Sequence, residues 1–122
     1  FYINENGNIS FVDAQAAVDP FGFPQRGEPM IAPFWADVDT RGTGAVYLSR
    51  GTSSRGNPFV QIDWIDVGYF NARTDKKNTF SLYIEDDPAG DVVVFDYNNM
   101  NWTTGDRNGT AGFGGQGGAR VP

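Results

Sequence analysis

The chain alternates apolar and polar residues most clearly over Thr79–Glu85, which predicts a β-strand. Its apolar side chains are expected to face a core and the others, Glu85 included, to face solvent, because successive strand residues point to opposite faces. The residues Asp87–Gly90 then place proline and glycine where a type I turn favours them. The apolar run Val92–Tyr97 follows this turn, so the two segments predict a β-hairpin.

A longer segment, Phe59–Phe70, predicts a second strand in which the alternation changes phase. Every second residue from Val60 to Trp64 is apolar, and the alternation then restarts at Ile65. A slip of one residue moves the apolar side chains to the other face of a sheet. The pattern therefore predicts a β-bulge near Trp64 and Ile65.

Shorter strand-like segments extend the pattern over the rest of the chain. They are Phe1–Asn4 and Asn8–Val12 around an Asn-Gly turn, Ile31–Asp39, Ala45–Arg50, and a short edge strand at Ala119–Val121. The three prolines and two glycines of Val18–Pro29 predict an ordered loop without strand pairing. Helix-forming residues are confined to Asp13–Ala17, which could form one turn at most.

Short strands punctuated by turns, without crossover helices, predict an all-β fold. We expect an antiparallel β-sandwich or barrel-like domain with long ordered loops and a glycine-rich C-terminal segment, Gly105–Gly118. The expected core consists of aromatic and aliphatic residues of the predicted strands: Phe34, Trp35, Val60, Ile62, Phe80, Leu82, Ile84, Val93 and Phe95.

The composition excludes several classes of function. A length of 122 residues fits a single domain. With 15 acidic and 9 basic residues, the chain lacks the basic surface that nucleic-acid binding requires. Neither cysteine nor histidine occurs, which removes disulfides, thiolate metal sites, most zinc sites and histidine general-base catalysis. No apolar run reaches the ~18 residues of a membrane helix, so we expect no membrane insertion by this segment.

The segment Ile31–Asp39, with the sequence IAPFWADVD, resembles the signature of the nidogen-like domain family. Similar blocks follow in the family's order: Gly7–Phe11 before the signature, and Asp63–Phe70, Asp75–Leu82, Val94–Tyr97 and Trp102–Gly105 after it. The resemblance covers Gly7 to about Val121, with Ser81 where the family usually has glutamine. It implies that residues 1–122 form one extracellular domain, excised from or part of a larger protein, without enzymatic activity, catalytic residues or a bound cofactor.

The resemblance also implies a structural or adhesive role in an extracellular matrix, at a cell surface or in an extracellular filament. The expected partners are other extracellular proteins or copies of the chain itself. An alternative is a secreted or cell-surface domain that binds carbohydrate, with calcium assisting, in which Trp35, Trp64 and Trp102 would form a platform for sugar rings. Exposure of the tryptophans distinguishes these hypotheses, because a platform needs exposed rings and a core needs buried ones.

Asp37 and Asp39 are the candidate ligands for a metal ion, which would be calcium. Alternation puts both on one face of the predicted strand, followed by Arg41 and a glycine, as in a calcium-binding loop. An EF-type loop would need an acidic or amide residue at Arg41 and a glutamate at Leu48. We therefore expect the carboxylates to be structural and neutralised by the guanidinium of Arg41.

Further candidate residues lie outside this pair. Asp63 and Asp66 could act as the paired carboxylates of a glycosidase, but we expect them to face solvent or pair with a basic residue. Three sequons predict a glycoprotein, with acceptors at Asn8, Asn101 and Asn108. Candidates for a contact surface in the glycine-rich loop are Arg107, Phe113 and Gln116.

Overall fold

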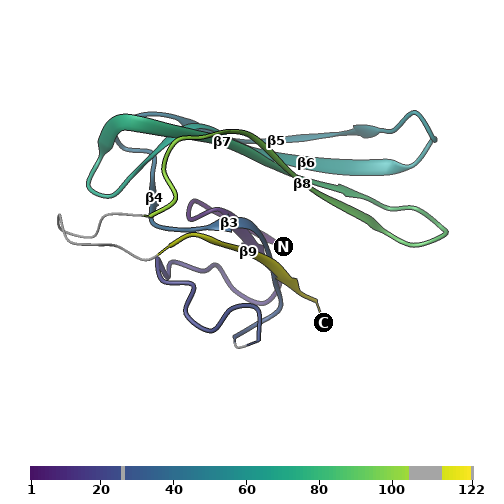
Figure 1. The fold of residues 1–122 in the computed structure, drawn as a ribbon. Helices are drawn as coiled ribbons and strands as arrows, with labels where there is room; N and C mark the ends of the chain where they lie inside the picture. Colours follow the sequence, from purple (N-terminus) through teal and green to yellow (C-terminus); the bar gives the residue numbers. More distant parts are fainter. Residues whose placement is uncertain (26, 105–113, 122) are drawn as a thin grey trace.

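The computed structural model describes residues 1–25, 27–104 and 114–121, and two antiparallel β-sheets confirm the all-β fold. Sheet A has the order β1 (Tyr2–Asn4), β2 (Asn8–Ser10), β3 (Met30–Trp35), β9 (Gln116–Arg120). Sheet B has the order β4 (Val38–Asp39), β6 (Pro58–Tyr69), β7 (Arg73–Glu85), β8 (Val92–Met100), with β5 (Ala45–Thr52) also paired to β6. The sheets lie one above the other, with the loop between β2 and β3 beneath sheet A (Figure 1). No helical turn forms at Asp13–Ala17, where one turn at most was expected.

The β7–β8 hairpin has the predicted turn, but β7 begins at Arg73, earlier than expected.

The predicted bulge in β6 is also present. The register of β6 against β7 shifts between Trp64 and Val67, and Asp66 between them has a φ of 52°. Val67 thereby returns to the interior while Ile65 stays exposed.

The predicted strand Ile31–Asp39 is instead two strands in different sheets. β3 ends at Trp35 and β4 begins at Val38, so the chain passes here from sheet A to sheet B. β3 is buried along its whole length because it has a layer on each face. A strand covered on both sides has a nearly continuous apolar sequence, which hides its boundary from a two-residue period. Pro33 lies where the register against β9 shifts, a position that tolerates a missing N–H.

The main core lies between the sheets and is largely aromatic. Trp64 and Phe80 are fully buried and stacked with ring centroids 5.1 Å apart. The Phe34 ring meets Phe80 and Trp102 edge-on, at centroid distances of 5.5 and 5.3 Å. Around these rings pack the buried side chains of Ile9, Ile31, Ala36, Val38, Ile62, Val67, Tyr69 and Leu82.

A second, smaller core lies on the other face of sheet A. Trp35, predicted to be in the main core, packs there with Phe23, Met30 and Ala32. Its indole N–H donates to the carbonyl of Ala17 at 2.8 Å, which attaches the long β2–β3 loop to the sheet. The predicted ordered loop is therefore the cover of sheet A.

The β1–β2 hairpin turns at the predicted Asn-Gly pair. Gly7 has a φ of 78°, and a β-carbon there would lie 1.9 Å from the carbonyl oxygen of Phe34. The Gly7 carbonyl in turn accepts the N–H of Phe34 at 3.3 Å. Glycine is thus required both by the turn and by the close approach of β3.

Two expectations about burial are wrong, each for its own reason. The hairpin tips of sheet B extend beyond sheet A (Figure 1), so Val93 is 43% exposed and does not belong to the core. Val60, Ile84 and Phe95 are partly buried at the margin of the core. Glu85, expected in solvent, is fully buried because Arg55 of the β5–β6 turn covers it and forms an ion pair with it.

Replacing Phe80 by alanine is expected to lower the free energy of unfolding by about 3–5 kcal/mol, since both of its aromatic neighbours lose a contact surface. Urea unfolding measures this loss. The matched variant Val93→Ala should cost less than about 1 kcal/mol because its side chain already contacts solvent. Equal losses in the two variants would contradict the position of the core.

Candidate functional site

Asp39 is a buried carboxylate that is fully engaged in hydrogen bonds. Its Oδ1 accepts the backbone N–H and the Nε–H of Arg41, at 3.0 and 2.9 Å. Its Oδ2 accepts the Nη2–H of Arg41 and, at 2.8 Å, the backbone N–H of Ala72. The bidentate pairing predicted from the sequence is therefore present, and it holds the pKa of Asp39 well below its usual range, chiefly through the Arg41 hydrogen bonds.

This ion pair joins the β4–β5 turn to the β6–β7 turn. Arg41 also donates to Asn71 Oδ1 at 3.2 Å, and its guanidinium lies 5.8 Å from the centre of the Phe70 ring. Ala72 has a φ of 53°, a conformation unfavourable for alanine, and the Asp39 carboxylate holds its N–H in place. The structural role of Asp39 is thus to fix two turns against each other.

Asp37 lies outside β4, so the expected alternation with Asp39 along one strand does not apply. Its carbonyl accepts the Phe70 N–H at 3.2 Å, and its carboxylate contributes, with that of Glu5, to the negative field around Arg41. Within residues 1–25, 27–104 and 114–121, no group of three or more acidic side chains is arranged to hold a metal ion. A structural role for both carboxylates, rather than calcium binding, stays the prediction.

Asp63 and Asp66 are held by neutral groups, not by a basic residue. Asp63 Oδ1 accepts the hydroxyl of Ser81 at 2.5 Å and the side-chain amide of Gln61 at 2.8 Å. Asp66 is exposed at the bulge and accepts the Thr79 hydroxyl at 3.4 Å. These hydrogen bonds, two of them to β7 and one within β6, account for the positions of both carboxylates without a catalytic role.

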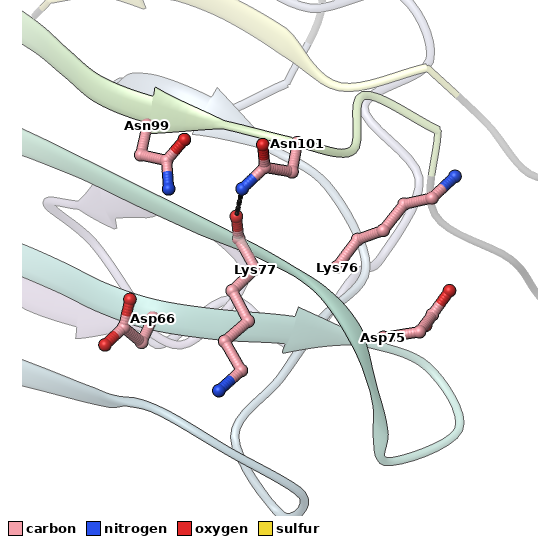
Figure 2. Close-up of a pocket in the computed structure, with 6 residues that line it drawn as sticks. All are labelled: Asp66, Asp75, Lys76, Lys77, Asn99 and Asn101. Atoms are coloured by element: carbon pink, nitrogen blue, oxygen red, sulfur yellow. Dashed lines mark hydrogen bonds between the residues drawn. The ribbon is translucent and has the colours of Figure 1, made fainter.

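A polar hollow opens on the outer face of sheet B, near the β6–β7 turn. Figure 2 shows Asn99 and Asn101 beside Lys77, whose carbonyl accepts the side-chain amide of Asn101 at 2.8 Å. The lining consists entirely of polar residues: Asp66, Asp75, Lys76, Lys77, Asn99 and Asn101. The hollow offers carboxylates, ammonium groups and amides as hydrogen-bonding groups, but its lining contains no aromatic ring on which a sugar could stack.

The predicted glycosylation and loop residues fall into three groups. Asn8 is fully buried and accepts the Asn4 amide at 2.8 Å, so a glycan at this position has no room in the folded domain. Asn101 is exposed. Asn108, Arg107 and Phe113 lie outside the described residues.

Gln116 is exposed on β9 and pairs with Trp35 of β3.

The three tryptophans are buried, with 7%, 0% and 5% of Trp35, Trp64 and Trp102 exposed. Core packing of the tryptophans is therefore confirmed, and the alternative of a platform of exposed indole rings is wrong.

An apolar surface that the sequence did not reveal lies where sheet B extends past sheet A. Register places Arg50, Val60, Ile84 and Val93 in one row across four strands. The apolar side chains of this row remain partly uncovered, as does that of the adjoining Leu48, which is 43% exposed. A shallow hollow here is lined by Arg50, Gly51, Pro58, Phe59, Val60, Ile84, Asp86 and Asp91. We call this region the open face of sheet B.

The structure is thus a β domain of two sheets, and the segment Ile31–Asp39 passes from one sheet to the other. Comparison with known proteins gives the family of this domain. The family model of the nidogen-like domain matches residues 1–57 and 51–120, so the chain belongs to the nidogen-like domain family. This result confirms the resemblance found in the sequence.

The similar curated proteins are much longer than this chain. Alpha-tectorin of Mus musculus is 30% identical over 130 residues, covering 88% of this chain and 6% of that protein. Nidogen of Drosophila melanogaster is 30% identical over 138 residues, covering 93% and 10%. Mucin-4 of Mus musculus is 27% identical over 139 residues, covering 84% and 4%. No solved structure matches the chain at a significant level.

Membership of this family places the domain outside the cell, in a secreted or matrix protein, as the sequence predicted. The matches indicate no catalytic family. No helix of the described ranges is long and apolar enough to cross a membrane.

Replacing Asp39 by asparagine is expected to destabilise the domain by about 2 kcal/mol at neutral pH, because an amide cannot accept all of the donors that face the carboxylate. The folded pKa lies below the unfolded value of about 3.9, so the carboxylate stabilises the fold above that value and loses its effect as the pH falls further. The difference between wild type and variant should therefore shrink below about pH 4. Urea unfolding between neutral and acidic pH measures it.

The matched control is Asp91→Asn, which alters an exposed carboxylate and should change stability by no more than about 0.5 kcal/mol. A loss for Asp39→Asn that stays constant down to the lowest pH would show that the carboxylate charge is unimportant.

Proposed function

We propose that this domain is a non-catalytic contact module of a longer extracellular protein and that it binds other extracellular proteins through the open face of sheet B. The observation that supports the proposal is the row of Val60, Ile84 and Val93, which continues the apolar inner face of sheet B past the cover that sheet A provides. Apolar side chains left uncovered at the end of a sheet are typical of an interaction surface.

The composition of the open face favours a protein partner. Its apolar centre is bordered by the charged groups of Arg50, Asp86 and Asp91, an arrangement that resembles the apolar core and polar rim of protein interfaces. The carboxylates with a resolved role serve the fold: Asp39 fixes turns, and Asp63 joins neighbouring strands. Neither is available as a nucleophile or general acid, which supports a binding role over a catalytic one.

Carbohydrate binding is the competing function, and the polar hollow around Lys77 and Asn99 is where it would occur. Asn101, the exposed sequon asparagine at this hollow, is our proposed glycan acceptor. Protein sites for sugars combine hydrogen-bonding groups with an aromatic face. Because the lining has no aromatic residue, the open face is the better supported surface.

Replacing Val93 by aspartate is expected to weaken retention of the domain on a cell-derived extracellular matrix by about tenfold or more, since a charge at the centre of an apolar contact must be desolvated. A fluorescent fusion of the domain, washed over decellularised matrix, gives the retained fraction.

The matched control is Ile65→Asp, which introduces the same charge at a residue of similar exposure, 39%, on the outer face. Equal retention of both variants would rule out the open face. Loss of retention in Lys77→Ala and competition by soluble polysaccharide would indicate the carbohydrate function instead.

We also propose that Asp37 and Asp39 are structural and that the fold needs no calcium. The midpoint temperature Tm should then be the same with a chelator and with millimolar calcium, because Arg41 already neutralises Asp39. A calcium site occupied at about 100 times its Kd would add ~2.7 kcal/mol and raise Tm by several degrees. A rise of that size, abolished by Asp37→Asn, would make the domain calcium-dependent.

A further inference from the structure

The open face of sheet B ends in two acidic side chains, where the β7–β8 turn projects past sheet A (Figure 1). Asp86 comes two residues after Ile84, so both side chains point to the same face of the sheet. The Asp86 N–H donates to the Pro58 carbonyl at 2.9 Å, which continues the pairing with β6 just past the end of β7. Asp91 is placed in the same way, two residues before Val93. Both carboxylates therefore line the shallow hollow of the open face.

The domain supplies no positive partner for these two carboxylates. In the part of the chain that the structure describes, neither Asp86 nor Asp91 forms an ion pair, and both residues are exposed. Arg55 of the β5–β6 turn is already paired with Glu85 on the outer face. Arg50 also lines the hollow, but it lies on β5, at the other end of the row from β8. The end of the hollow next to the β7–β8 turn is consequently acidic.

Between these charges the lining of the hollow is apolar. It is formed by Pro58, Phe59, Val60 and Ile84, with Gly51 at the β5 side. The hollow has a volume of about 320 Å³, at the lower end of the ~300–1,000 Å³ that ligand sites usually have. A shallow hollow of this size suits one or two side chains of a protein better than a small molecule, which needs an enclosed site.

We infer that the open face binds a protein segment in which an apolar side chain is followed by a lysine or an arginine. The apolar side chain fills the hollow against Val60 and Ile84, and the basic group lies beside Asp86 and Asp91. An apolar anchor with complementary charges at its margin is the usual composition of a protein contact. The inference rests on the proposed function and deepens it, because it states the chemistry of the partner.

The charge of the chain disfavours other occupants of the same surface. A sulfated polysaccharide or an anionic lipid surface would bring further negative charge to Asp86 and Asp91. A second copy of this chain carries the same net charge of −6 and is repelled as a whole. A basic protein segment is attracted both by the acidic end of the hollow and by the net charge of the domain.

Nuclear magnetic resonance titration with two synthetic peptides tests the inference. Both have blocked ends, and their sequences are Gly-Lys-Leu-Phe-Lys-Gly and Gly-Glu-Leu-Phe-Glu-Gly. The methyl signals of Val60, Ile84 and Val93 should shift with the lysine peptide. At low salt its Kd should be at least about fivefold lower than that of the glutamate peptide, and added salt should reduce this difference.

Three substitutions locate the charge preference on the molecule. Asp86→Asn and Asp91→Asn should each raise the Kd of the lysine peptide by about twofold to fivefold at low salt, as expected for exposed charge pairs. The matched control is Asp96→Asn, the same change at an exposed residue of β8 on the outer face, which should leave the Kd unchanged. Arg50→Gln removes a like charge at the far end of the row and should not raise the Kd.

Equal Kd values for the two peptides, equal effects of Asp91→Asn and Asp96→Asn, or no methyl shifts with either peptide would overturn the inference. Val93→Asn removes apolar surface without changing the charge, so its retention on decellularised matrix tests the proposed function separately. Retention that is lost in Val93→Asn but kept in Asp86→Asn and Asp91→Asn would leave the open face as the binding surface and disprove the basic partner. Retention kept in all three variants would disprove both.

Discussion

Burying three indole rings requires an acceptor for each indole N–H, and the placement of the irregular segments follows from this requirement. Trp64 donates to a carbonyl of the β1–β2 turn at 3.0 Å, and Trp102 donates to a carbonyl of the bulged part of β6 at 3.1 Å. Trp35 donates to a carbonyl of the loop before β3. Each ring thereby attaches a segment with little strand pairing of its own to a sheet. The aromatic core and the loops are consequently one structure and should be lost together.

The passage of the chain from sheet A to sheet B is the second organising feature. β3 contributes to the core on both of its faces and ends at Trp35, and within a few residues the chain has joined the other sheet as β4. Asp39, at the end of β4, then fixes the turns that follow through Arg41 and Ala72. One short stretch thus joins the sheets, supplies both cores and sets the turns, which accounts physically for its density of aromatic and acidic residues.

Features decided by neighbours in the sequence were predictable, and features decided by distant segments were not. The β7–β8 hairpin, the bulge after Trp64 and the Asp39–Arg41 pair all depend on residues within one strand or turn. The exposure of Val93 depends on where another sheet ends, and the burial of Glu85 depends on a turn that folds over it. Asn8 has an acceptor sequon but lies in a buried network with Asn4 that forms only when β1 and β2 pair.

The register of sheet A has a mechanical consequence. Tyr2, Ser10, Met30 and Arg120 lie in one row, so the chain enters and leaves the sheet at the same end, with three interstrand spacings of about 4.8 Å between the two points. A tensile force applied through the two ends loads the hydrogen bonds of β1 and β9 one after another, as in unzipping, rather than all together, as in shear. Sheet A then yields at low force while the long ladders of sheet B carry none of the load. In a matrix under strain, such a domain lengthens first at sheet A, through which the force enters, and the open face of sheet B stays intact.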